Sequence, residues 1–169
     1  MKFLTVVAIS LVASCATTQQ RNLTDSEIAM VMRVANLGEV REGELARTKA
    51  TDTSVRDFAS MMVTEHTAQN NKTESELARV DVASADSDLS RQLDAASGDA
   101  TDRLRALSAF DRAYMDRQVD AHQSLIALID SKLTPSARKK QVREQLTALR
   151  ALADKHLTRA KQIQGSLPR

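Results

Sequence analysis

The chain has little of what a β-rich, disulfide-bonded or nucleic-acid-binding protein needs. Among its 169 residues are four Gly, two Pro, one Cys and no Trp, and only 2% are aromatic. So few turn-forming residues exclude a many-stranded sheet and favour an all-α chain. A single Cys excludes a disulfide framework within one chain. The 24 basic and 22 acidic residues are interleaved, so we expect no nucleic-acid partner, which would require a one-sided basic surface or stacking aromatics.

The N-terminus has the pattern of a bacterial lipoprotein signal. A basic start at Lys2 precedes an apolar run over residues 3–13, which is too short to span a ~30 Å hydrocarbon core. Residues 12–15 (VASC) resemble a lipobox, in which the cysteine is lipidated and becomes the new N-terminus. We therefore expect a signal peptide over residues 1–14, a lipid such as palmitate on Cys15, and a polar tether over residues 15–23. An ordinary cleavable signal with an incidental cysteine is the alternative.

Hydrophobic periodicity predicts four amphipathic helices within one domain over residues 24–165. A capping box from Thr24 to Glu27 places the first helix near residues 25–50, and the second follows over residues 53–80. Residues 81–107 are rich in Ser, Asp and Ala, and we expect a long crossover there with only short helical pieces. The third helix is predicted over residues 108–133, and Pro135 is expected to begin the fourth. Together these elements predict an all-α four-helix bundle.

The three histidines are the first candidates for function, because each of them falls on the apolar, core-facing stripe of its predicted helix. At 1.5 Å per residue, Glu39, His66 and His122 lie about 20 Å from one end of the bundle and share a layer. The same count places His156 about 33 Å along the fourth helix, outside that layer.

Two interpretations fit these polar residues. One divalent transition-metal ion could be held by Glu39, His66 and His122, with Glu42 or Glu65 as a further carboxylate ligand. Alternatively, the histidines are buried polar residues whose hydrogen bonds fix helix register. No role is assigned to four other polar residues of the core, which are Glu42, Glu65, Tyr114 and His156.

Several segments carry a family resemblance. They are residues 35–40 (ANLGEV), 55–67 (VRDFASMMVTEHT), 110–115 (FDRAYM) with Gln118-Val119 and His122, and the pair His156-Leu157. Over residues 26–163 the chain resembles the bacterial domain-of-unknown-function family 4142 (DUF4142), although Glu65 stands where that family usually has Asp. The resemblance implies a ferritin-like four-helix bundle with a long crossover between helices two and three. It also implies an outer-membrane or periplasmic location and no established activity.

No catalytic motif is present. The residues three positions before the histidines are Val63, Val119 and Ala153, so the Glu-x-x-His pattern of di-iron bundles is missing. The sequence also has no phosphate loop and no nucleophile elbow. We therefore expect a non-enzymatic binding or interaction module. Its lipid would anchor it in the cell envelope, at the outer membrane and facing the periplasm, with an envelope protein as partner. A metal-buffering or metal-sensing protein that uses Glu39, His66 and His122 is the alternative.

Overall fold

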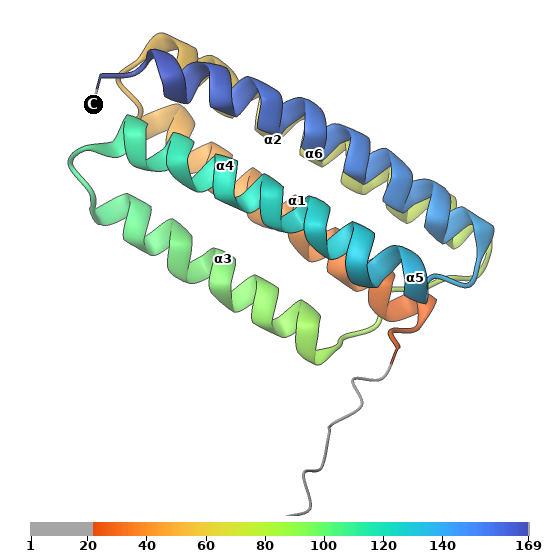
Figure 1. The fold of residues 1–169 in the computed structure, drawn as a ribbon. Helices are drawn as coiled ribbons and strands as arrows, with labels where there is room; N and C mark the ends of the chain where they lie inside the picture. The colour runs from red at the N-terminus through yellow and green to blue at the C-terminus, as the bar shows by residue number, and fades with distance from the viewer. Residues whose placement is uncertain (1–21, 169) are drawn as a thin grey trace, which may run out of the picture.

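The structure, a computed structural model, describes residues 22–168, and their regular secondary structure is entirely helical (Figure 1). The expected signal peptide, the lipidation site at Cys15 and most of the tether lie outside the described residues. Within residues 22–168, no helix is long and apolar enough to cross a membrane. The all-α prediction is confirmed.

Five helices of 19 to 27 residues make up most of the described chain. They are α1 (Asp25–Lys49), α2 (Thr53–Ala78), α3 (Asp88–Ala106), α4 (Phe110–Leu128) and α6 (Lys140–Ser166). A π-helical turn, η1 (Ile129–Leu133), and a three-residue helix, α5 (Thr134–Ser136), extend α4 before the chain reverses.

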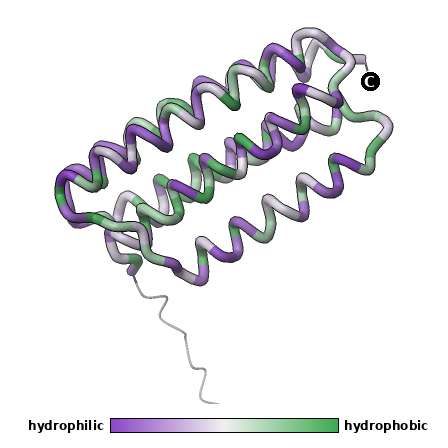
Figure 2. Tube along the Cα trace, turned by 180° about the vertical axis from the view of Figure 1, so that it is seen from behind, coloured by the Kyte–Doolittle hydropathy of each residue, from purple (hydrophilic) through white to green (hydrophobic). Residues whose placement is uncertain are grey.

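The long helices lie side by side in layers (Figure 1). The helix α1 packs against α2, α4 packs against α6, and α2 also contacts α6. The helices α1, α3 and α6 run in one direction and α2 and α4 in the other, as the colours in Figure 1 show. The helix α3 packs mainly on α1 as an outer layer, and much of its trace is hydrophilic in Figure 2.

The starts of the first two helices follow from their capping residues. The Thr24 hydroxyl accepts a 3.2 Å hydrogen bond from the backbone N–H of Glu27, whose carboxylate accepts one of 2.8 Å from the Thr24 N–H. This reciprocal pair is the predicted capping box. The Asp52 carboxylate caps α2 by accepting from the Ser54 and Val55 N–H groups. Both caps satisfy backbone donors that lack an intrahelical partner.

The helix α3 corrects the prediction of a crossover with only short helical pieces. It spans 19 residues and begins at a Ser87–Ser90 capping pair. Its buried face consists mostly of small residues, namely Ser90, Ser97, Ala100, Thr101 and Leu104. The segment carries an apolar stripe at helical spacing, formed by Leu89, Leu93, Ala96, Ala100 and Leu104, but its many Ser and Asp residues favoured the prediction of a crossover. The described chain therefore has five long helices, and a simple four-helix bundle is not confirmed.

The last helix also begins later than predicted. Pro135 lies in α5, which continues the preceding turn, and α6 starts only at Lys140. Between them, the backbone N–H groups of Arg138 and Lys139 donate to the Asp25 carboxylate, at 2.8 and 3.0 Å. This contact holds the reversal against the start of α1. The later start shifts every residue of α6 along the bundle relative to the sequence-based count.

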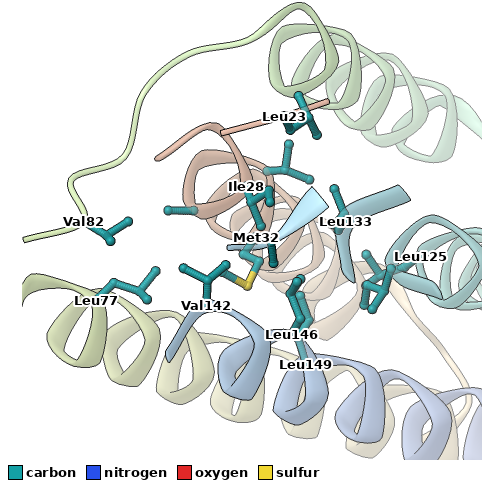
Figure 3. Close-up of a cluster of buried hydrophobic side chains, with 14 of the residues drawn as sticks. Leu23, Ile28, Met32, Leu77, Val82, Leu125, Leu133, Val142, Leu146 and Leu149 are labelled. Atoms are coloured by element: carbon teal, nitrogen blue, oxygen red, sulfur yellow. The ribbon is translucent and has the colours of Figure 1, made fainter. Parts of the chain in front are cut away.

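Two apolar clusters fill the interior, one toward each end of the helices. The first contains Ile28, Met32, Leu125, Leu146 and Leu149, whose side chains point toward one another in Figure 3. The second is built around aromatic and Met side chains, including Phe58, Met62, Phe110, Tyr114 and Met115. On each of four helices, a buried polar residue falls in sequence between members of the two clusters: Asn36, His66, His122 and His156. A polar layer thus separates the two apolar clusters.

Candidate metal centre

The three histidines meet in this polar layer. His66 comes from α2, His122 from α4 and His156 from α6, and all three side chains are fully buried. Their ring centroids lie 5.0 to 5.9 Å apart. One nitrogen from each ring falls within 4.8 Å of the other two. They are the only group of three or more potential His, Cys, Asp or Glu ligands found in the described residues.

The prediction that His156 lies in a different layer is wrong. Its Nδ1 atom lies 3.2 Å from Nε2 of His66. The count from residue 134 assigned six residues to the helix that in fact belong to the reversal, since α6 starts at Lys140. Six residues correspond to about 9 Å of helix. Removing them brings His156 back toward the middle of the bundle.

Asn36 determines which nitrogen of His66 carries the proton. The Asn36 side-chain N–H donates to the carbonyl of Met32 at 2.9 Å, so its carbonyl oxygen is the atom that faces His66. His66 Nδ1 lies 2.9 Å from that oxygen and must donate to it. In a neutral imidazole the other nitrogen, Nε2, then carries a free lone pair. That lone pair points toward His156, because the Nε2 atom is the one close to it.

His122 is oriented by its own helix. Its Nδ1 atom lies 2.8 Å from the backbone carbonyl of Gln118, which can only accept, so Nδ1 donates. The Nε2 atom of His122 is buried and has no hydrogen-bond partner among the described residues. A buried acceptor without a partner is costly, and its presence in a native interior calls for an explanation.

His156 is oriented by a carboxylate. Its Nε2 atom lies 2.8 Å from Glu65 Oε2, and Glu65 is also paired with Lys155. Burial opposes ionisation of Glu65, but the hydrogen bonds from Lys155 and His156 lower its pKa. Glu65 is therefore an ionised acceptor, and His156 donates to it through Nε2. The Nδ1 atom of His156 is left with a lone pair facing the lone pair of His66 Nε2.

Burial keeps all three rings neutral. It lowers the pKa of His122 to about 4, although the Gln118 carbonyl opposes the shift. It also lowers the pKa of His156 to about 4 in spite of Glu65. The pKa of His66 falls well below its ordinary value because of burial and the two neighbouring histidines. A proton shared between the rings is therefore disfavoured, whereas three neutral imidazoles form a ligand set for a cation.

The carboxylates of α1 do not belong to the histidine cluster. Glu42 accepts hydrogen bonds from Arg117 and Gln118, at 2.9 to 3.2 Å. Burial raises the pKa of Glu42 to about 7, with a further contribution from Glu39 and opposition from Arg117. Burial likewise raises the pKa of Glu39, opposed by Arg117 and Gln118. Glu39 contributes no oxygen to the group of ligand atoms that lie within 4.8 Å of one another. The structure therefore does not form the predicted grouping of Glu39 with His66 and His122.

The structure places the remaining predicted residue, Tyr114, in the second apolar cluster. Its ring stacks on Phe110 at 5.8 Å and meets the edge of Phe58 at 6.3 Å. The Tyr114 hydroxyl is buried with no hydrogen-bond partner among the described residues. Burial, together with the charges of Glu39 and Glu42, raises its pKa well above the ordinary value.

The sequence motifs contain Asn36 and Gln118, but no site role was predicted for these two residues, which orient two of the three histidines. Asn36 is buried at the edge of the α1 seam, one turn after Met32. A polar residue at such a position is a usable signal, because a buried amide requires partners. The role of Gln118 lies in its backbone carbonyl, which no side-chain pattern can reveal.

Comparison with known proteins identifies a family. A family model described as "Domain of unknown function (DUF4142)" matches residues 11–163, nearly the whole chain. The comparisons with curated proteins and with solved structures each found no match.

Proposed function

This chain belongs to the DUF4142 family, and from its buried histidines we propose that it binds one divalent transition-metal ion through His66, His122 and His156. One observation carries the proposal. Each ring donates one N–H to a fixed acceptor, so one nitrogen of each ring keeps a free lone pair, and a nitrogen from each ring lies within 4.8 Å of the other two. Metal-binding histidines typically use their second N–H in this way, and the acceptor sets the tautomer and orients the ring.

The separation of two of the three ring nitrogens suits an ion such as Zn²⁺. Zinc binds imidazole at about 2.0–2.1 Å, so two nitrogens on one tetrahedral ion lie about 3.3 Å apart. His66 Nε2 and His156 Nδ1 are separated by 3.2 Å. The acceptors on the far sides of the rings are an amide, a backbone carbonyl and a carboxylate. Neutral imidazole suits Zn²⁺, Cu²⁺ and Ni²⁺ better than Mg²⁺ or Ca²⁺.

Metal retention fits the burial of the site better than catalysis does. The three rings have no solvent exposure, and a substrate would need access to the open coordination position of a catalytic ion. We therefore propose a buffering or storage role.

As part of the same proposal, α1, α2, α4 and α6 form a ferritin-like arrangement, with α3 in the long connection between α2 and α4. A lipid anchor at Cys15, an outer-membrane location facing the periplasm and an envelope protein partner stay predictions.

The decisive experiment is a calorimetric titration of the untagged protein with zinc. Elemental analysis of the titrated protein then gives the number of zinc ions bound. A Cys15→Ser background removes the one thiol that could compete for the metal. The key variant is His122→Asn, because the Asn amide can still donate to the Gln118 carbonyl while the ligand nitrogen is lost. We expect one equivalent of zinc in the parent protein and at least a hundredfold weaker binding in the variant.

Two further variants separate this site from the alternatives. Glu39→Gln should leave zinc affinity unchanged, because Glu39 contributes no ligand atom to the histidine cluster. Glu65→Gln should weaken binding about 10- to 100-fold, the usual effect of removing a carboxylate that orients a ligating histidine. Less than a tenth of an equivalent of zinc in the parent protein, or equal binding in His122→Asn with its fold intact by circular dichroism, would rule out the proposal.

A further inference from the structure

An apolar slot lies between α1, α3 and α4, and none of the three histidines lines it. The helix α3 packs mainly on α1 and contacts α4 much less, which leaves a pocket of about 180 Å³ among the three helices. Most of its lining is aliphatic and includes Val34, Ala35, Leu93, Ala96, Leu125 and Leu128. We call this pocket the apolar slot.

The polar residues of the lining do not call for a charged ligand. Glu42 is satisfied by Arg117, whose guanidinium donates twice to its Oε1 atom, and by Gln118 at Oε2. The Oε2 atom of Glu39 and the hydroxyl of Ser97 have almost no accessible surface, so they do not open into the slot. Burial raises the pKa of both Glu39 and Glu42, which disfavours a second negative charge beside the single guanidinium. The site is therefore electrostatically closed.

The aliphatic side of the slot is continuous with the first apolar cluster. Leu125 belongs to that cluster, and Ala35, Leu93 and Leu128 are partly buried and pack against it. These three side chains come from α1, α3 and α4, and each of them lines the slot. An apolar group placed there would remove their remaining exposed surface from water, which is favourable in proportion to the area covered. The slot is thus an open extension of the hydrophobic core.

The slot is long and narrow. On α1 its lining extends from Val34 to Glu42, about 12 Å at 1.5 Å per residue. A volume of about 180 Å³ spread over this length suits an extended chain better than a ring. Engineered cavities of about 150 Å³ hold benzene, so the slot has room for roughly six or seven non-hydrogen atoms. Its lining includes Ala96 on α3 and Ser124 on α4, which are both exposed, so the slot opens to solvent between these two helices.

We propose that the apolar slot binds the end of an unbranched, saturated hydrocarbon chain of about six carbons, carried by a single-chain amphiphile. The chain lies against Leu93, Leu125 and Leu128, and the polar head group stays in solvent beyond Ala96 and Ser124. A charged chain end would be disfavoured inside the slot, because the guanidinium of Arg117 is already paired and the buried acceptors do not face the space. Neither metal binding nor the histidine cluster is needed for this second site.

Titration of the full chain with 1-hexanol, followed by NMR of the methyl groups, tests the proposal. The Cys15→Ser background prevents the predicted lipid of the protein from competing for the slot. We expect shifts of the Leu93, Leu125 and Leu128 methyl resonances and nuclear Overhauser contacts from these methyls to the hexyl chain. Affinity should rise by up to about fourfold for each methylene from 1-propanol to 1-hexanol, as chain burial predicts.

Two matched probes test the shape of the ligand and the position of its head group. Cyclohexanol has the same number of carbons and the same hydroxyl, but its ring is too wide for the slot. We expect it to bind at least about fivefold more weakly than 1-hexanol. Hexylphosphocholine carries the same chain on a large zwitterionic head, and it should bind with similar affinity because the head group stays outside.

Variants assign the binding to the slot. Ala35→Leu adds three carbons to the α1 side of the slot and should weaken 1-hexanol binding at least about tenfold. Ala95→Leu is the matched control, since Ala95 is exposed on α3 and does not line the slot, and we expect no change. His122→Asn should also have no effect, which separates this site from the metal centre.

Three results would overturn the proposal. The first is that 1-hexanol shifts none of the slot methyls in the parent protein, a measurement that does not depend on any variant folding. The second is that cyclohexanol binds as tightly as 1-hexanol, or that hexylphosphocholine does not bind. The third is that an Ala35→Leu variant with its fold intact by circular dichroism binds 1-hexanol as tightly as the parent protein.

Discussion

The pH dependence of zinc binding provides a sharp test of the buried histidine cluster. Zinc competes with protons for imidazole nitrogens, so affinity falls once the histidines become protonated. An exposed imidazole with a pKa near 6.5 is about 75% neutral at pH 7 and about 3% neutral at pH 5. A site that needs three such rings in the neutral form therefore loses affinity by roughly 10⁴-fold between these pH values.

The cluster described here should behave differently. Burial lowers the pKa of both His122 and His156 to about 4, so each ring is still about 90% neutral at pH 5. The pKa of His66 is lowered as well, to well below its ordinary value. Proton competition at the three rings should then weaken zinc binding by no more than about twofold between pH 7 and pH 5. The sign follows from burial, which disfavours the charged imidazolium more than the neutral ring.

Equilibrium dialysis with elemental analysis at both pH values measures this change directly. Circular dichroism at each pH checks that the fold persists, because the unfolded chain takes up protons at its histidines below about pH 6.5 and the buried rings do not. That linkage lowers the stability of the folded state as pH falls from about 6.5 toward 4. A loss of zinc affinity above a thousandfold in a protein that is still folded would refute the reasoning, since it would show that the rings titrate as exposed histidines do.

Four further predictions concern stability and location. Gly98→Ala should raise the free energy of unfolding by about 0.5–1 kcal/mol, since the added Cβ meets only Arg41 at 3.7 Å within a helix. Gly43→Ala should lower the free energy of unfolding by about 1–3 kcal/mol, because its Cβ would lie 2.9 Å from Val63. Thermal melts compare the two glycine variants, and equal shifts in melting temperature would contradict the packing of α1 on α2. Tyr114→Phe removes a buried hydroxyl without a partner and should leave stability unchanged or raise it by about 1 kcal/mol in chemical denaturation; a clear loss would mean that the hydroxyl is bonded. Cys15→Ser should release the protein from the membrane fraction of its host cells, and retention there would argue against a lipid anchor.

Much of the fold follows from local patterns. The capping box at Thr24 predicts the start of α1, because this motif acts through backbone groups only a few residues away. The helix α3 was not predicted as one continuous helix, although Leu89, Leu93, Ala96, Ala100 and Leu104 recur at helical spacing. Its Ser and Thr side chains resemble a polar linker in sequence, and their burial depends on packing, as where Ser97 lies against α1 at Gly38.

By itself, the sequence determined that the chain is helical and that its three histidines face the interior, since both properties depend on periodicity along single helices. Which histidines meet was decided by the tertiary structure, because depth in the bundle depends on where the chain reverses. The reversal before Lys140 is held by Asp25, more than a hundred residues away in sequence, and it brings His156 to His66. The same packing places Glu39 near Arg117 and leaves it out of the histidine cluster. Helix periodicity predicts which face of each helix points inward. A binding site also depends on how far neighbouring helices are shifted along one another.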